Sequence, residues 1–226
     1  MSRGLGDVYK RQSFYTPREI VQYMVDESLV THLKRTVGNE LESEYRKLLD
    51  YADNEILLTE QQKLAIMQSL YNCKILDPAC GSGAFPVGVL QQMVHILKQI
   101  DPDNSRWKNM LLQFAIDETS EAYLNSTAEE RREAVADIER AFDENVNYPD
   151  YARKLHLIEN CIYGVDIQPI AIQISKLRFF ISLVIDQKRN NNPADNFGIR
   201  PLPNLEAKFV AANSLLGLKR TEASLF

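Results

Sequence analysis

The chain has 226 residues, of which 45% are hydrophobic and 25% are charged, and its net charge is −5. This length and composition are typical of a globular protein with one large or two small domains. The acidic balance argues against a nucleic-acid-binding module, because such modules usually carry a basic surface. No uninterrupted apolar run reaches the roughly 18 residues of a membrane span, and no signal peptide is recognisable at the start of the chain.

The first folded element is expected after a short tail. Residues 1–12 match no helix or strand pattern and resemble translated sequencing-adapter sequence, so we expect a disordered tail or an artefact that replaces the natural N-terminus. Thr16 is a favourable N-cap, Pro17 suits the first helical position, and Glu19 completes a capping box. The pattern predicts a helix here, within an N-terminal helical part that spans residues 13–72.

A glycine turn follows the apolar residues Ile75 and Leu76 and opens a second part, residues 73–226. The turn contains Asp77, Pro78, Ala79, Cys80, Gly81 and Gly83. Apolar residues at helical spacing follow it, so the order is strand, glycine turn and helix. Glycine permits positive φ and close approach of a ligand. The helix N-terminus attracts an anion, and the acid can accept hydrogen bonds from an amine or a hydroxyl.

Two glycines separated by one residue are a weak signal by themselves. The dinucleotide-binding fingerprint needs a third glycine three residues after the second, where this chain has Pro86. A nicotinamide or flavin site is therefore disfavoured. A plain strand-to-helix turn explains the two glycines equally well.

A strand pattern returns after a helical insertion at about residues 101–159. A short apolar run ends at Asp166, and a strongly apolar helix is predicted over residues 169–185. An acid that closes the second strand suits two ribose hydroxyls, but the usual spacing from the glycine turn is about 20 residues. The much longer spacing here favours a helix N-cap. A third strand over residues 208–212 leads to Asn213, which a simple turn would explain equally well.

No metal site is predicted. Cys73, Cys80 and Cys161 are too few and too scattered for a zinc site or a disulfide framework. Free buried thiols in a reducing cytoplasm are the expected state. His95 and His156 are isolated at helical positions and are interpreted as structural.

Three segments closely resemble DNA adenine-N6 methyltransferases, especially the large, type IIG-like methylase domains of combined restriction–modification enzymes. They are Phe14-Tyr15-Thr16-Pro17, Asp77-Pro78-Ala79-Cys80-Gly81-Ser82-Gly83-Ala84-Phe85 and Tyr163-Gly164-Val165-Asp166-Ile167-Gln168-Pro169-Ile170-Ala171. The resemblance implies an α/β, Rossmann-like S-adenosylmethionine-dependent methyltransferase fold. Its partial doubly wound sheet would have the strand order third, second, first, and would carry N-terminal helices and a helical insertion.

The resemblance also implies a role for each matching residue. The methionine end of S-adenosylmethionine would lie against the glycine turn, namely Asp77, Pro78, Ala79, Gly81 and Gly83. Thr16 and Pro17 would close over it, with Phe14 or Tyr15 packed beside it. At the other end, Asp166 would hold the ribose and Ile167 would pack on the adenine. Asn213 and Ser214 would bind near the exocyclic amine of that adenine.

The catalytic motif of the family, Asn/Asp-Pro-Pro-Tyr/Phe, does not occur in this chain. We therefore expect the cofactor-binding part of a larger prokaryotic, cytoplasmic enzyme, without catalytic residues and inactive by itself. Double-stranded DNA with a flipped adenine would be bound by regions beyond this chain. A fragment of an RNA or protein-glutamine methyltransferase and a non-catalytic binding module remain alternatives. The oligomeric state is not predicted.

Overall fold

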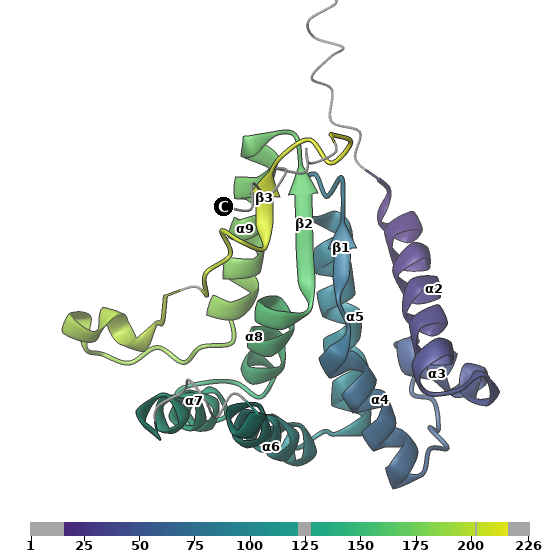
Figure 1. The fold of residues 1–226 in the computed structure, drawn as a ribbon, viewed down its shortest axis with the longest axis horizontal. Coiled ribbons are helices and arrows are strands. Elements are labelled where there is room, and N and C mark those ends of the chain that lie inside the picture. Colours follow the sequence, from purple (N-terminus) through teal and green to yellow (C-terminus); the bar gives the residue numbers. More distant parts are fainter. Residues whose placement is uncertain (1–15, 122–127, 202, 217–226) are drawn as a thin grey trace, which may run out of the picture.

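The computed structural model describes residues 16–121, 128–201 and 203–216. It shows a mixed α/β protein with a small sheet and many helices (Figure 1). The expectations for residues 1–12, Phe14 and Tyr15 lie outside the described residues.

The centre of the fold is a three-stranded parallel sheet. Its strands are β1 (Ile75–Asp77), β2 (Ile162–Asp166) and β3 (Phe209–Ala211). They pair in the order β1-β2-β3, with Asp77 opposite Gly164 and Asp166 opposite Ala211. The order agrees with the prediction. Because the strands are parallel, their carboxyl ends lie at one edge of the sheet.

Two apolar helices connect the strands and pack on the sheet. They are α5 (Ala84–Ile100), which follows β1, and α9 (Pro169–Val184), which joins β2 to β3. Parallel crossovers are right-handed. Two such crossovers that advance in the same direction therefore lie on the same face (Figure 1). On the other face Leu76 and Val210 are 61% and 41% exposed, and no helix of the described residues covers them. Helices on both faces, as a doubly wound sheet requires, are thus not seen in this part of the chain.

The N-terminal part is helical, as predicted. It consists of α2 (Arg18–Thr36), the 3-10 helix η1 (Asn39–Leu41), α3 (Glu42–Leu49) and α4 (Glu60–Asn72). Helix α2 packs closely on α5. A Cβ added at Gly88 of α5 would lie only 3.3 Å from Val21 and 3.4 Å from Val25 of α2. The missing side chain at Gly88 therefore sets the distance between these helices.

The start of α2 differs from the prediction. The N-cap is Pro17, without a side-chain cap hydrogen bond, and the backbone N–H groups of Ile20 and Val21 donate to its carbonyl. The helix begins one residue later than expected. Glu19 is therefore not at the third helical position, and Thr16 and Glu19 cannot form a capping box.

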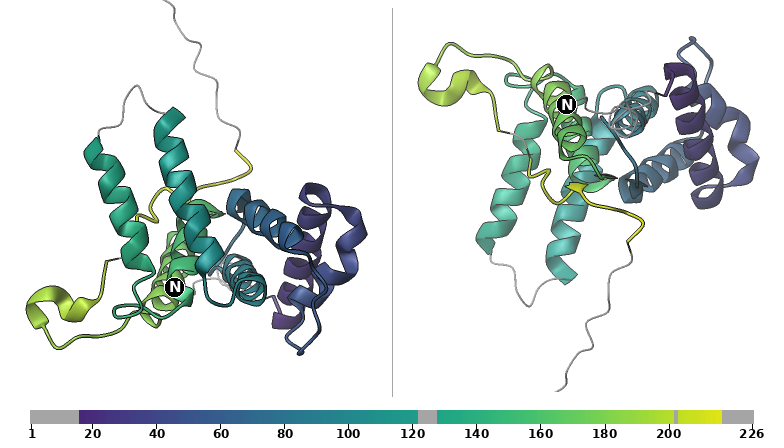
Figure 2. Two further views of the ribbon diagram at one scale, coloured as in Figure 1. Left: turned by 90° about the horizontal axis from the view of Figure 1, so that it is seen from below. Right: turned by 90° about the horizontal axis from the view of Figure 1, so that it is seen from above.

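The insertion lies at the end of the sheet where the strands begin (Figure 1). Its helices are α6 (Ser105–Glu121), α7 (Ala128–Ala141) and α8 (Asp150–Asn160). Helices α6 and α7 form an antiparallel pair that projects from the body (Figure 2). Helix α8 packs on α5 and α9 and leads directly into β2. After α9, the segment η2 (Pro193–Gly198) consists of short 3-10 turns interrupted by a kink and lies in the loop before β3. Among the described helices, none combines the length and apolarity that crossing a bilayer would require.

Candidate functional site

The glycine turn between β1 and α5 has the backbone conformation that the sequence predicts. Gly81 and Gly83 have φ of +53° and +83°, in the left-handed region that favours glycine. A Cβ added at Gly81 would meet nothing within 4 Å, so this side of the turn is open. Helix α5 starts here without a side-chain cap and without an acid in its first turn. Its N-terminus is therefore suited to an anionic group of a ligand.

Asp77, at the carboxyl end of β1, has one satisfied and one unsatisfied carboxylate oxygen. Oδ1 accepts a hydrogen bond from the backbone N–H of Ala79 at 3.0 Å. Oδ2 is buried and has no hydrogen-bond partner among the described residues. Burial, and secondly the negative charge of Asp166, raise the pKa of Asp77 above its usual value. Buried acceptors rarely remain unpaired, so a ligand that donates a hydrogen bond, and especially a cationic one, fits here.

Asp166, at the end of β2, contacts the glycine turn directly. Its Oδ2 accepts a hydrogen bond from the N–H of Gly81 at 2.9 Å, and its Oδ1 accepts one from the N–H of Gln168 at 2.8 Å. The N-cap of α9 is Gln168, so the alternative interpretation of Asp166 as N-cap is wrong. Each oxygen retains a further lone pair that could accept a hydroxyl. The adjacent Ile167 is 67% exposed and offers an apolar surface beside this carboxylate.

Asn213 and Ser214 follow β3 at the same edge of the sheet. Both residues are exposed, and Oδ1 of Asn213 accepts a hydrogen bond from the N–H of Leu215 at 3.0 Å. The strand end is fixed to its neighbour, since the N–H of Ala212 donates to the carbonyl of Asp166 at 2.9 Å. The turn interpretation of Asn213 is therefore realised, and its role toward a ligand stays a prediction.

Thr16 and Pro17 lie at the start of α2, at the same end of the molecule as the carboxyl ends of the strands (Figure 1). Asp77, Asp166 and Asn213 thus lie at or just after the carboxyl ends of three neighbouring strands, whereas Thr16 and Pro17 share only that end of the molecule. One direct hydrogen bond joins Asp166 to Gly81, whereas the segment that carries Asn213 is held to β2 by the backbone bond from Ala212 to Asp166.

Residues that the sequence interpretation missed support the turn from behind. Ser175 and Arg178 of α9 donate hydrogen bonds to the carbonyls of Gly81 and Ser82. Gly164 of β2 is also required, because a Cβ there would lie 2.7 Å from the Phe209 ring and 2.9 Å from Sγ of Cys80. The sequence signal for Ser175 and Arg178 was their spacing, because they are polar residues three positions apart on a strongly apolar helix.

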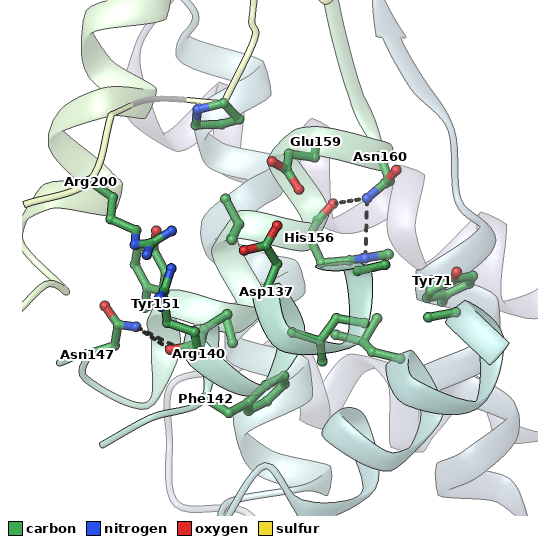
Figure 3. A pocket seen from close by; sticks show the side chains of 18 of the residues that line it. Tyr71, Asp137, Arg140, Phe142, Asn147, Tyr151, His156, Glu159, Asn160 and Arg200 are labelled. Carbon is green, nitrogen blue, oxygen red and sulfur yellow. Dashed lines mark hydrogen bonds between the residues drawn. The ribbon is translucent and has the colours of Figure 1, made fainter. Parts of the chain in front are cut away.

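A separate cavity of about 710 Å³ lies between α4, α6, α7, α8 and the residues Arg200, Pro201 and Pro203 (Figure 3). Here burial, and secondly Lys74, lower the pKa of His156 to about 4. The ring of His156 stacks on Tyr71 at 4.5 Å and accepts the side-chain amide of Asn160 at Nδ1. These contacts are consistent with the structural role expected for this histidine. Glu159, on the same wall, has a pKa raised by burial and by Asp137.

The described residues contain no group of three or more His, Cys, Asp or Glu side chains that could hold a metal ion. The cysteines Cys73, Cys80 and Cys161 are buried free thiols, as predicted.

A protein of Methanocaldococcus jannaschii, described as a predicted type II restriction enzyme and methyltransferase, is 26% identical to this chain over 227 residues. The match covers 95% of this chain, and the chain spans 15% of the length of that relative. No protein-family model matches the sequence, and no solved structure matches it. The match supports a relationship to restriction–modification methyltransferases, and the α/β architecture is compatible with a methyltransferase fold.

Proposed function

We propose that this chain is the S-adenosylmethionine-binding part of a site-specific DNA methyltransferase that acts on adenine N6 in a restriction–modification or phage-defence system. The sheet would then be part of a Rossmann-like methyltransferase fold. The observation that carries the proposal is the buried Oδ2 of Asp77, which has no hydrogen-bond partner in the part of the chain that the structure describes, together with the open turn at Gly81. The relative in M. jannaschii supports the reaction class.

The residues present fit the methionine end of this cofactor. Its ammonium group can donate to Oδ2 of Asp77, which supplies a charge-assisted hydrogen bond in a partly buried position. Its carboxylate can lie at the N-terminus of α5, where the helix dipole favours an anion. Pro78, Ala79, Gly81 and Gly83 would shape the backbone around it, and Thr16 and Pro17, with Phe14 or Tyr15, would cover it. The cofactor supplies an activated methyl group on a sulfonium centre.

The adenosine end fits the edge formed by β2 and β3. The unused lone pairs of Asp166 can accept the two ribose hydroxyls, and the exposed side chain of Ile167 can pack on the adenine ring. Asn213 and Ser214 would contact the exocyclic amine. These side chains orient the cofactor and transfer no proton, because none of them needs to change its protonation state.

The target base would be handled elsewhere. No Asn/Asp-Pro-Pro-Tyr/Phe string occurs in this sequence, and its net charge is −5. Contacts to the target amine and to the DNA phosphates would then come from other segments of a larger protein. A flipped adenine in double-stranded DNA is the proposed substrate, since the N6 amine lies inside the duplex.

Calorimetric titration of the 226-residue chain with S-adenosylmethionine tests the cofactor assignment. We expect binding of S-adenosylmethionine and S-adenosylhomocysteine and none of NAD, because the third glycine of the dinucleotide fingerprint is absent. Asp77→Asn should weaken binding at least tenfold, the size expected for a hydrogen bond to a charged group. Wild-type affinity in the Asn variant would refute the site, and preferential NAD binding would refute the cofactor.

The nucleic-acid assignment needs the parent protein in its host. Sequencing the genomic DNA before and after deletion of the gene should reveal N6-methyladenine at one short sequence, lost in the deletion strain. Unchanged DNA methylation together with lost RNA or protein-glutamine methylation would favour those substrates instead.

A further inference from the structure

Two side chains of α9 hold successive carbonyl groups of the glycine turn. Oγ of Ser175 donates to the carbonyl of Gly81 at 2.9 Å, and Nη1 of Arg178 donates to the carbonyl of Ser82 at 3.1 Å. The two donors are three residues apart and therefore lie on the same face of the helix. The bonded pairs are 94 and 96 residues apart in the sequence.

The turn also rests on Ser175 sterically. Ser175 is fully buried, and a Cβ added at Gly83 would lie 2.8 Å from its Oγ and 3.1 Å from its Cβ. The positive φ of Gly83 and this close approach both require glycine. The packing of α9 and the conformation of the turn are therefore specified together.

Arg178 of α9 is half-buried, and its guanidinium bonds to the glycine turn. The cations of α9, Lys176 and Arg178, bond to Glu206 and to the turn, while Ile174 and Leu177 are exposed. Withdrawing a guanidinium from water is unfavourable unless it gains a hydrogen-bond partner. The Ser82 carbonyl is that partner, and the arginine in turn satisfies a backbone acceptor.

We propose that Ser175 and Arg178 are positioning residues for the cofactor, acting through the glycine turn. This inference rests on the proposed function. In a trans peptide the C=O and the following N–H point in opposite directions. Holding the carbonyl of Gly81 against α9 therefore directs the Ser82 N–H away from α9. The turn is kept in one shape before the ligand arrives, so less conformational entropy is lost on binding.

The variants Ser175→Ala and Arg178→Met remove one donor each. Ser182→Ala is the matched hydroxyl control, because Oγ of Ser182 donates within α9, to the carbonyl of Phe179. Lys176→Met is the matched charge control, since Lys176 pairs with Glu206 and not with the turn. Arg178→Lys keeps a cationic donor and should rescue the loss.

Three measurements decide the outcome: S-adenosylmethionine affinity by calorimetry, amide hydrogen exchange of residues 80–84, and unfolding in urea. We expect Arg178→Met and Ser175→Ala to weaken binding five- to tenfold and to speed exchange in the turn by a similar factor. The controls should match the wild type in both, and Arg178→Lys should lie within about threefold of it.

The failure of each idea is distinguishable. If the wild-type chain does not bind S-adenosylmethionine, the proposed function is refuted. Hydrogen exchange would still test whether Ser175 and Arg178 support the turn. Wild-type exchange at residues 80–84 in both Arg178→Met and Ser175→Ala would overturn the inference. A lower stability in urea with unchanged exchange and affinity would also overturn it, because such a result indicates a general packing role.

Discussion

The carboxylate of Asp166 accepts a hydrogen bond from the backbone N–H of Gly81 at 2.9 Å, although 85 residues separate them in the sequence. This contact joins the end of β2 to the turn after β1. An acid that the family resemblance assigns to a ribose is therefore also a support of the glycine turn. The contact makes the two ends of the proposed cofactor site dependent on each other.

Replacement of Asp166 by Ala should lower both stability and affinity. The change leaves the N–H groups of Gly81 and Gln168 without their acceptors. We expect the free energy of unfolding to fall by about 1–3 kcal/mol, the usual cost of losing such partners. Urea denaturation checks the first effect and calorimetry with S-adenosylmethionine the second. Unchanged stability with reduced affinity would mean that Asp166 is a ligand residue without a supporting role.

Replacement of Asp77 by Asn should have the opposite effect on stability from the replacement of Asp166 by Ala. Burial raises its pKa, so the folded protein binds the Asp77 proton more tightly than the unfolded chain does. As pH rises through this raised pKa, the ionised group opposes folding. Asp77→Asn should therefore equal or exceed the wild type in melting temperature at neutral pH, while S-adenosylmethionine binding is weakened at least tenfold. In the wild type, affinity should fall as pH is lowered through the same pKa. A clear drop in the melting temperature of Asp77→Asn would contradict this balance.

Local patterns predicted the parts of the fold that depend on neighbouring residues. The strand that ends at Asp77 and the positive φ of Gly81 and Gly83 agree with the structure. The first turn of α2 was misjudged, because Pro17 takes the capping position that Thr16 was expected to fill.

Contacts between distant segments could not be predicted from such patterns. An arginine in an apolar helix looks like a surface residue, and only the crossover that packs α9 behind the turn gives Arg178 its carbonyl partner. Likewise, Gly164 resembles an ordinary strand residue until Phe209 is placed opposite it. The cofactor roles of Asp77, Asp166 and Asn213 remain predictions.

The neutral, buried imidazole of His156 should make stability pH-dependent. Its pKa is lowered to about 4 in the folded protein, from an unfolded value near 6.5. Between these values the unfolded chain takes up a proton that the folded protein does not, so stability is lost as pH falls from 6.5 to 4. The loss amounts to about 2–3 kcal/mol.

His156→Gln removes this titration and keeps a polar side chain near Asn160. The difference in unfolding free energy between wild type and variant should therefore shrink as the pH falls from 6.5 to 4. Taking the difference is necessary because Glu159, on the same cavity wall, has a raised pKa and contributes the opposite slope. A constant difference across this range would show that His156 has the same pKa in the folded and unfolded states.

An apolar row on the outer side of α9 should limit the concentration at which the chain remains dispersed. The row consists of Ile170, Ile174, Leu177, Ile181 and Ile185, all exposed. Exposed apolar patches promote association. Ile174→Lys combined with Leu177→Lys should raise the concentration at which light scattering detects aggregates, without lowering the free energy of unfolding. Leu183→Lys, at a buried position of the same helix, is the control that should unfold the protein.

Replacement of Gly164 or Gly81 by Ala should distinguish a glycine needed for packing from one needed for cofactor binding. At Gly164 the new Cβ would lie 2.7 Å from the Phe209 ring and 2.9 Å from Sγ of Cys80. Overpacking of this kind costs about 1–3 kcal/mol, so Gly164→Ala should lower the free energy of unfolding by that amount.

At Gly81 the new Cβ meets nothing within 4 Å, and the cost is the roughly 1–2 kcal/mol of a left-handed backbone. In the proposed site, however, that methyl group fills space that the cofactor needs. Gly81→Ala should therefore lose more affinity for S-adenosylmethionine than its stability loss accounts for, measured by calorimetry on protein that urea denaturation shows to be folded. Equal affinity in Gly81→Ala and wild type would place the ligand away from this turn.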